Sequence, residues 1–350
     1  MKITRIGLDL AKSVFQVFGV DVHEKRALSR QLKRKDMESF FRALPPCLIG
    51  MEACASAHYW AWVLTEMGHT VKLMAPQFVK PYVKGNKNDA NDAEAICEAV
   101  SRPGMRFVPI KTIEQLHLQA RHRVRTELLK QRTAKANQIR GLLAEYGIVI
   151  GLGVRCLRHH LPEILEEAEN RLQEDFRVLL RGLRDDLVYL DERLKTEDAA
   201  IETLARTHAG ARRLQQLRGV GPLVATALIA ALGDGRQFTN GRQASAWAGL
   251  VPGQHSSGGK STLLGISKRG DAYLRTLLIH GARSALRAAR DKTDRLSQWL
   301  QGLCARRNKN VAAVALANKT MRLAWALLRR EEDYDPLYGR AAPATQAAPA

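Results

Sequence analysis

The first hundred residues alternate short strand-like and helix-like segments, and this alternation limits the fold more than any other feature of the chain. Three strands joined by turns come first, and they are followed by helix, strand, helix, strand and helix. Cys47–Glu52 is apolar on both faces, as a strand in the centre of a sheet must be. The predicted segments are Ile3–Asp9, Val14–Val20, Arg26–Leu32, Asp36–Leu44, Cys47–Glu52, His58–Met67, Thr70–Met74 and Asn91–Val100.

This order matches a ribonuclease-H-like α/β fold, in which the first and fourth strands lie side by side. Asp9 ends the first strand and Glu52 ends the fourth, so both carboxylates are expected at one edge of the sheet. Asp89 and Asp92 are three residues apart at the start of the last helix, on one helix face. Each acid also has an ordinary explanation, since Asp9 could shape a turn and Asp89 could cap a helix. Four acids at positions that suit one fold favour a shared site.

Four carboxylates in one cleft repel one another unless divalent cations neutralise them. Two-metal phosphoryl transfer uses such carboxylates to hold cations about 3.5 to 4 Å apart beside the attacking and leaving oxygens. We therefore predict that Asp9, Glu52, Asp89 and Asp92 are metal ligands and catalytic residues. All-oxygen ligands favour Mg²⁺, and Mn²⁺ also fits.

The rest of the chain is strongly cationic, which indicates a polyanionic partner such as nucleic acid. It has 55 Lys and Arg against 35 Asp and Glu, a formal charge of +20 and a pI of about 10.1. No run approaches the roughly 18 apolar residues of a membrane span, and no signal peptide is expected. The cysteines have no C-x-x-C spacing, so we expect reduced thiols in a cytosolic protein. They are Cys47, Cys54, Cys97, Cys156 and Cys304.

Residues 106–205 predict a helical coiled-coil hairpin. Thr112–Tyr146 has a helical pattern, and a break at residues 147–153 would let a second helix fold back. The second helix has apolar residues in steps of three and four, which favours a coiled-coil seam. These residues are Leu172, Phe176, Leu179, Leu183, Leu187, Leu190 and Leu194.

The first helix of this hairpin is strongly basic. A solvated face would explain its charges, but acids are scarce among them, which favours contact with nucleic acid. The predicted contacts are Arg121, Arg125 and Arg132, in a cluster that also has Arg123, Lys130, Lys135 and Arg140.

Residues 206–330 are predicted to form a mostly helical domain, and residues 331–350 a disordered tail that is acidic and then Ala/Pro-rich. Within the domain, Leu217–Ala225 resembles a helix-hairpin-helix turn, in which Gly219 and Gly221 would expose backbone amides to a phosphate. A tight turn that needs glycine for steric reasons alone fits this segment equally well.

Pro252–Ser261 is rich in serine and glycine, and its default interpretation is a flexible surface loop. A nucleophilic serine would need activation and nearby positive charge to stabilise the developing anion. Lys260, Lys268, Arg269 and Arg275 could supply that charge. The segment is not a P-loop, because its lysine lacks the G-x-x-x-x-G-K-[ST] context.

Motifs spread over residues 3–330 resemble, in matching order, the DEDD transposases of bacterial insertion sequences that a bridge (seeker) RNA guides. They are Gly7–Lys12, Met51–Ala53, Asn86–Ala93, Gly219–Gly221 and Ala248–Pro252 with the Ser256–Gly259 loop. The resemblance implies a RuvC-like domain over residues 1–105, a coiled-coil linker over 106–205 and a transposase domain over 206–330. It places the acidic tetrad on Asp9, Glu52, Asp89 and Asp92, and the nucleophile on Ser257, with Ser256 as the alternative.

The same resemblance implies a recombinase that uses Mg²⁺ and a covalent serine–DNA link. Its expected partners are DNA, a noncoding bridge RNA and further copies of the chain, in the bacterial cytoplasm at the nucleoid. Lys260, Lys268 and Arg269 would join the basic helix and Gly219–Gly221 in contacting nucleic acid. Two alternatives remain open: a RuvC-like junction nuclease that hydrolyses DNA with water, and a noncatalytic nucleic-acid-binding protein.

Overall fold

The computed structural model describes residues 2–86 and 88–336. The chain divides into two compact units, Met1–Thr112 (unit 1) and Ile113–Ala350 (unit 2). The predicted domain boundary at residue 205 falls inside unit 2 and stays a prediction. Lys87 of the Asn86–Ala93 motif and residues 337–350 of the predicted disordered tail lie outside the described residues.

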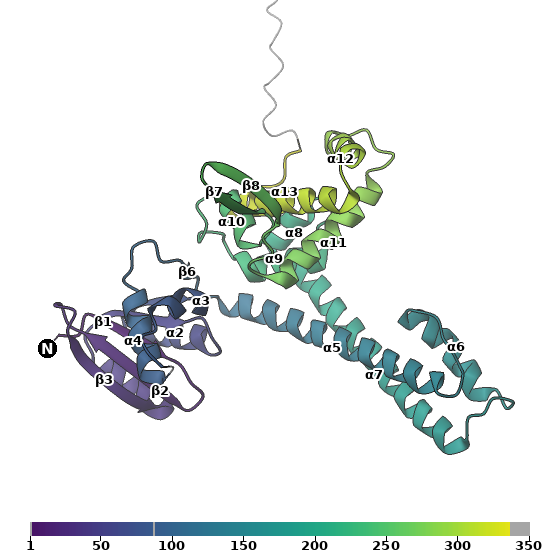
Figure 1. The fold of residues 1–350 in the computed structure, drawn as a ribbon, viewed down its shortest axis with the longest axis horizontal. Helices are drawn as coiled ribbons and strands as arrows, with labels where there is room; N and C mark the ends of the chain where they lie inside the picture. The colour runs from purple at the N-terminus through teal and green to yellow at the C-terminus, as the bar shows by residue number, and fades with distance from the viewer. Residues whose placement is uncertain (1, 87, 337–350) are drawn as a thin grey trace, which may run out of the picture. The chain divides into compact units, whose positions relative to one another are not determined.

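Unit 1 contains a six-stranded mixed sheet in its described residues, with the strand order β3-β2-β1-β4-β5-β6 (Figure 1). Strand β1 is parallel to β4, so the expected adjacency of the first and fourth strands is confirmed. Strand β4 is parallel to β5, and the other pairs are antiparallel. The elements are β1 (Arg5–Asp9), β2 (Val14–Val20), β3 (Arg26–Lys33), η1 (Arg34–Asp36), α1 (Met37–Arg42), β4 (Leu48–Glu52), α2 (Ala57–Glu66), β5 (Thr70–Met74), α3 (Pro76–Val79), η2 (Lys80–Tyr82), α4 (Asp89–Ala99) and β6 (Phe107–Val108).

The sheet of unit 1 is covered on both faces because successive side chains of a strand point to opposite sides. Ile6 and Leu8 of β1 are fully buried in a cluster with Phe41 of α1 and Trp60 of α2. The opposite face is covered by α4, which packs against β1, β2 and β4. Unit 1 therefore has helix, sheet and helix in three layers.

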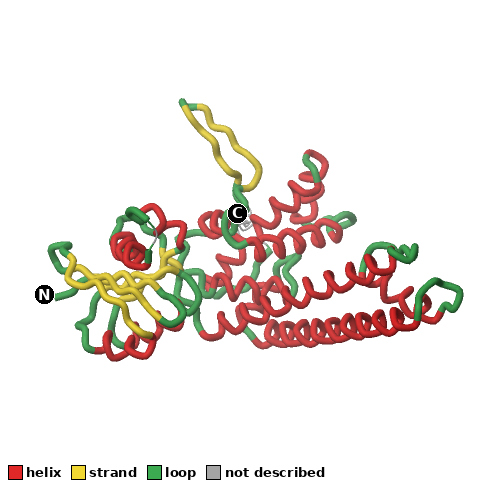
Figure 2. Tube along the Cα trace, turned by 60° about the horizontal axis from the view of Figure 1, so that its bottom comes forward, coloured by secondary structure: helices red, strands yellow, loops and turns green. Residues whose placement is uncertain are grey.

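Unit 2 is mostly helical, as predicted, and contains one two-stranded sheet in its described residues (Figure 2). Its elements are α5 (Ile113–Ala144), α6 (Val154–Glu166), α7 (Glu174–Thr207), α8 (Ala209–Gln215), α9 (Pro222–Leu232), α10 (Gly241–Trp247), β7 (Pro252–Ser257), β8 (Lys260–Ile266), α11 (Ala272–Ala288), α12 (Arg295–Arg306) and α13 (Lys309–Arg330).

The two long helices α5 and α7 pack along each other, but the connection between them contains α6, a helix that was not predicted. Leu190 and Leu194 of the predicted seam are buried with Leu128 of α5. Leu187 belongs to a second cluster that includes residues of both α5 and α6. Leu179 is 50% exposed and lies outside the seam. The seam therefore finds its partner helices within the same chain.

Helices α8, α9, α10, α11, α12 and α13 share one apolar core with Leu118 of α5 and Ala205 of α7. By length and composition, α13 is the one helix among the described residues that could cross a membrane. Its residues Leu316, Met321 and Ala324 are buried in the core of unit 2. This burial is the pattern of a core helix in a globular unit.

Candidate functional site

Asp9 and Glu52 end two neighbouring parallel strands. The register pairs Gly7 with Gly50 and Leu8 with Met51, so the two acids follow at the same level of the sheet. Residues two apart in a strand share a face. Asp9 therefore lies on the face of Gly7, and Glu52 lies on the face of Gly50.

Both glycines face α4 at very short range. A Cβ atom on Gly7 would lie 2.1 Å from the carbonyl oxygen of Ala93 and 2.4 Å from the amide nitrogen of Cys97. A Cβ atom on Gly50 would lie 2.8 Å from the Cβ of Val100. Only glycine lets the helix sit this close to the sheet. Asp9 and Glu52 consequently point to the side of the sheet that α4 covers.

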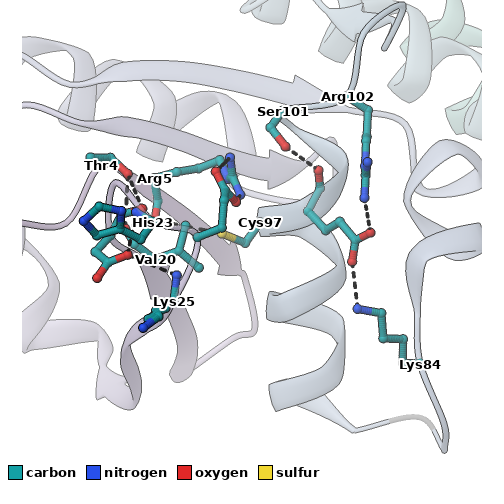
Figure 3. Close-up of polar contacts among 12 residues, drawn as sticks. Thr4, Arg5, Val20, His23, Lys25, Lys84, Cys97, Ser101 and Arg102 are labelled. Carbon is teal, nitrogen blue, oxygen red and sulfur yellow. Dashed lines mark hydrogen bonds and ion pairs between the residues drawn. The ribbon is translucent and has the colours of Figure 1, made fainter.

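The direction of α4 follows from its contacts with β1. Cys97 lies against both Gly7 and Arg5, with its Sγ donating to the Arg5 carbonyl oxygen at 3.9 Å (Figure 3), and Ala93, one helical turn earlier, lies against Gly7. The helix thus runs opposite to β1. Asp89 and Asp92 precede the buried Ala93 and Ile96 by four residues each, so they continue the sheet-facing stripe of α4.

Side chains on both sides of Asp89 fix the start of α4. The side chain of Asn88 accepts a hydrogen bond from the backbone N–H of Asn91 at 2.8 Å and caps the helix. Helix capping, the ordinary explanation for Asp89, is therefore performed by its neighbour. Lys84 and Arg102 both pair with Glu98 (Figure 3), which ties the chain on either side of α4 to the helix.

Cys54 lies close to two of the predicted ligands. Burial raises the pKa of its thiol, and the negative charges of Glu52 and Asp9 raise that pKa further. The backbone N–H of Cys54 also donates to the carbonyl oxygen of Glu52 at 2.9 Å. Cys54 was not predicted as a site residue, although its place two residues after a strand-ending acid is a signal present in the sequence.

The four carboxylates are the oxygen donors that Mg²⁺ prefers. No group of three His, Cys, Asp or Glu residues that could hold a metal ion is formed within the described part of the chain. The donor chemistry thus fits Mg²⁺, and the strand register places Asp9 and Glu52 at the same level of the sheet. Mg²⁺ commonly keeps several water ligands, so two protein carboxylates per ion suffice.

The predicted serine loop is a β-hairpin, so its default interpretation as a flexible loop is wrong (Figure 2). Strands β7 and β8 pair on either side of Gly258 and Gly259, whose φ values are +54° and +77°. Two successive residues with positive φ form the turn that best suits a two-residue hairpin. The Ser/Gly composition concealed this pairing, since it is also typical of loops.

Ser256 and Ser257 occupy opposite faces of this hairpin. Ser257 pairs with Lys260 across the turn, whereas Ser256 pairs with Ser261 and accepts a hydrogen bond from Gln254 at 2.8 Å. Both serines are exposed. The two hydroxyls consequently have different surroundings, and Ser257 shares its face with a cationic side chain.

Of the four cations predicted to assist the serine, three are exposed, namely Lys260, Lys268 and Arg269. Arg275 instead donates to the carbonyl oxygens of Ala248 and Arg269, at 3.1 and 3.3 Å. Arg275 therefore ties the segment after β8 to the one before β7.

The arginines that were predicted to contact nucleic acid from α5 are paired with acids of α7, an arrangement that was not predicted. Arg121 pairs with Glu197 at 3.0 Å. Arg125 pairs with Asp198 at 2.5 Å. Arg132 lies 3.3 Å from Asp191. The partner acids come from a helix far along the chain, so spacing within α5 gave no signal of them. Nucleic-acid binding by these arginines stays a prediction.

The Gly219–Gly221 turn has a clear steric role at its first glycine. Gly219 has a φ of +86°, and a Cβ atom there would lie 2.6 Å from the carbonyl oxygen of Gly281 in α11. Gly221 is exposed at the N-cap of α9, with no atom within 4 Å of the position of a Cβ. The steric explanation holds for Gly219, and Gly221 leaves room for a ligand to approach the backbone.

Comparison with known proteins gives matches over both units. Residues 6–148 match a family model of IS110-type DEDD proteins described as "Transposase". Residues 211–298 match the family described as "Transposase IS116/IS110/IS902 family".

Several curated proteins are similar over nearly the whole chain, and three of them illustrate the range. A "Probable family 20 transposase" of Pseudomonas aeruginosa is 56% identical over 337 residues, covering 96% of this chain and 100% of the relative. The "Transposase for insertion sequence element IS1111A" of Coxiella burnetii is 46% identical, covering 94% and 90%. The "Transposase for insertion sequence element IS1328" of Yersinia enterocolitica is 40% identical, covering 93% and 96%.

Proposed function

Because the chain belongs to the Transposase IS116/IS110/IS902 family, we propose that it moves an insertion sequence by RNA-guided recombination. It is a transposase, an enzyme that cleaves and joins DNA. Two observations support the proposal: Asp9 and Glu52 end neighbouring parallel strands, and Gly7 and Gly50 let α4, which begins at Asp89, pack closely on the same face of the sheet.

Unit 1 serves in this proposal as a ribonuclease-H-like, RuvC-like metal-dependent domain. Its central parallel pair β1 and β4 and its antiparallel β1-β2-β3 ribbon support that assignment. Asp9, Glu52, Asp89 and Asp92 would hold Mg²⁺, or Mn²⁺ in its place. When bound, the metal supplies Lewis-acid stabilisation of phosphate oxygens. The protein holds the acids in place through the glycine contacts under α4.

Unit 2 supplies the nucleophile. In the proposed step the Ser257 Oγ attacks a DNA phosphorus, an Oγ–P bond forms, and the bond from phosphorus to one deoxyribose oxygen breaks. The hydroxyl proton leaves Ser257, and the departing deoxyribose oxygen gains a proton. Lys260 shares the face of Ser257 and would stabilise the negative phosphate. Ser256, on the other face, is the alternative nucleophile.

The partners of the chain follow from the same proposal. DNA supplies the element ends and the target, and the formal charge of +20 suits a polyanion. A noncoding bridge RNA would select both DNA sites, as the resemblance to RNA-guided transposases implies. The working form would be a homo-oligomer in the bacterial cytoplasm, associated with the nucleoid.

The test uses the full-length chain with the RNA of its element, donor and target DNA, and Mg²⁺. We expect recombination and, after protease digestion, DNA that carries a phosphoserine-linked peptide containing Ser257. Ser257→Ala should lose the link and recombination, whereas Ser256→Ala should keep both. Asp92→Asn and Asp9→Asn should abolish recombination while folding and nucleic-acid binding persist.

The same experiment separates the other candidate functions. Cleaved junctions without a serine-linked product would identify a RuvC-like nuclease that uses water. Binding without any Mg²⁺-dependent cleavage would identify a noncatalytic nucleic-acid-binding protein. Recombination at the wild-type rate in Asp9→Asn would remove the assignment of the metal site.

A further inference from the structure

A groove of about 710 Å³ lies between α10, α12 and α13 of unit 2, and none of the residues assigned to chemistry above lines it. The cationic residues of its wall are Arg242, Lys319 and Arg322, and the aromatic ones are Trp299 and Trp325. No Asp or Glu is among the described residues that line it. The groove is therefore concave, positively charged and aromatic.

The three cations are exposed, and none of them forms an ion pair with another residue in the described part of the chain. They differ in this respect from Arg121, Arg125 and Arg132, which pair with acids of α7. Unbalanced positive charge gathered in one concavity raises the local concentration of anions. The charge pattern of the groove thus fits an anionic ligand.

The two tryptophans have different settings. Trp325 donates its indole N–H to the Gly235 carbonyl oxygen at 3.0 Å. This hydrogen bond holds the side chain in place as part of the groove wall. Trp299 is 36% exposed, and the Lys319 ammonium lies 5.0 Å from the centroid of its ring. Because the ammonium lies over one face of the indole, the other face is left for a flat ring, and the ammonium itself can contact a phosphate.

We propose that this groove binds single-stranded nucleic acid. Phosphates contact Arg242, Lys319 and Arg322, and an unpaired base stacks on Trp299. Paired bases keep their faces inside the duplex, so only a single strand can use the indole in this way. RNA and DNA share this chemistry. The inference goes beyond the proposed reaction and does not require the carboxylates or Ser257 to act.

The test measures fluorescence anisotropy of labelled oligonucleotides with the full-length protein in EDTA, where no strand is cut. The probes are oligouridylate and oligodeoxyuridylate of about 12 nucleotides, within the span of known single-strand sites, and a duplex of equal length. The variants are Trp299→Leu, Trp299→Phe and the triple change Arg242→Ala, Lys319→Ala, Arg322→Ala. Circular dichroism checks that each variant is folded.

A matched control removes the same charge elsewhere. Lys33, Lys35 and Arg42 are exposed residues of unit 1 and form no ion pair with the described residues. Replacing these three with alanine lowers the net charge of the protein as the triple groove variant does. A general loss of charge would weaken binding equally in both.

We expect Trp299→Leu to weaken single-strand binding by at least about fivefold, the lower range for losing one base–aromatic stack. Trp299→Phe should retain binding within about twofold, because phenylalanine also offers a stacking face. The triple groove variant should flatten the slope of log affinity against log salt by about two, the value for three single-strand phosphates. The matched control should bind more tightly than that variant.

Duplex affinity should change little in either tryptophan variant. The ratio of RNA to DNA affinity tells which strand the groove favours, and either result supports the proposal. Unchanged single-strand binding in Trp299→Leu and in the triple groove variant would overturn it. Equal losses of affinity for duplex and single strand in these variants would also overturn the proposal. So would binding of polyglutamate, a polyanion without bases, that depends on the groove residues while oligonucleotide binding does not.

Discussion

At the scale of single residues, Gly7 and Gly50 decide where the acids of unit 1 lie, although neither has any chemistry to contribute. Each sits two residues before a carboxylate and faces α4 across a gap that no Cβ can enter. A sequence pattern identifies Asp9 and Glu52 as acids that end strands. It does not reveal that the preceding glycines bring the helix with Asp89 and Asp92 onto the sheet.

Replacing Gly7 with alanine tests this dependence. The new Cβ would lie 2.1 Å from a backbone oxygen, so α4 must move away from the sheet. We expect a loss of about 1–3 kcal/mol in the free energy of unfolding, as for other overpacked cores, together with loss of recombination. Urea unfolding and a recombination assay measure the two effects.

Gly141→Ala is the matched control for this change. A Cβ atom on Gly141, inside α5, meets no atom within 4 Å, and alanine favours a helix by up to about 1 kcal/mol over glycine. This control should be as stable as the wild type or more stable. A Gly7→Ala protein with unchanged stability and activity would show that α4 has another way to reach its place.

A second single residue, His122, lies at the junction of α5, α9 and α11. Its Nε2 is 3.0 Å from the Thr226 hydroxyl, and its Nδ1 is 2.9 Å from the Tyr273 hydroxyl. Thr226 donates its proton to the carbonyl oxygen of Pro222. Thr226 therefore accepts from Nε2–H, and Nδ1 accepts from Tyr273, which is the arrangement of a neutral imidazole.

Burial lowers the pKa of His122 to about 4, and the positive charge of Arg125 contributes. The unfolded chain, with a histidine pKa near 6.5, binds this proton more readily than the folded protein does. The contribution of neutral His122 to the free energy of unfolding is fully present above about pH 6.5, and it is lost as the pH falls toward 4. The loss should be on the order of 3 kcal/mol.

Urea unfolding between pH 7.5 and pH 4 measures this loss, with His122→Gln as the reference that cannot take up the proton. The wild type should lose more stability than His122→Gln over this range. If the free energy of unfolding changed with pH in the same way in the wild type and in His122→Gln, the assignment of a neutral buried imidazole would be wrong.

At the scale of elements, the sequence predicted the strands of unit 1 well because their apolar patterns are set locally. Val14–Val20 and Thr70–Met74 have the bounds expected. The β7–β8 hairpin was missed because its backbone pairing leaves little apolar pattern: most of its side chains are exposed. Helix α6 was missed beside the glycine-rich break, although Leu157, Leu161 and Leu165 recur at four-residue steps on its buried face.

The ion pairs between α5 and α7 bear on the proposed nucleic-acid contacts. Changing Arg121, Arg125 and Arg132 together to glutamine should destabilise the helical pair, because Glu197 and Asp198 lose their cations and Asp191 keeps only its pair with Arg158. Each arginine has five donors, so one paired acid leaves others for phosphates. We therefore also expect lower nucleic-acid affinity and a flatter salt slope.

The control for these arginines neutralises their partners instead, with Glu197→Gln, Asp198→Asn and Asp191→Asn. It breaks the same pairs, and also the pair of Asp191 with Arg158, but keeps the cations, so stability should fall while the salt slope stays as steep as in the wild type. Thermal melts and anisotropy titrations at several salt concentrations report both quantities. An unchanged slope in the arginine variant would assign these side chains to packing of the hairpin alone.

At the scale of the whole molecule, the proposed acids and the proposed serine belong to different units of the chain. The apolar seam of α7 is covered by α5 and α6 of the same chain, so it no longer demands a helix from another subunit. The remaining reason to expect an oligomer is chemical, since strand exchange requires several cuts to be held in one assembly. We still propose that the tetrad of one subunit acts with Ser257 of another.

Mixing two inactive proteins tests this sharing. Asp9→Asn protein retains Ser257, and Ser257→Ala protein retains the tetrad, so a mixed assembly contains some intact combinations only if sites are shared. For random mixing in a two-fold dimer, about a quarter of the sites would be restored. Single-strand cleavage after unfolding and refolding the two proteins together measures that recovery.

Asp9→Asn mixed with Asp92→Asn provides the control, because no subunit in that mixture has a complete tetrad and no cleavage should return. Recovery confined to the first mixture would place the acids and the serine of each working site on different subunits. If both mixtures remain inactive although size measurements show that the subunits have exchanged, each chain must close its own site. The acids of unit 1 would then have to reach the β7–β8 hairpin of their own chain, and joining several strands would depend on complete sites brought together by DNA and RNA.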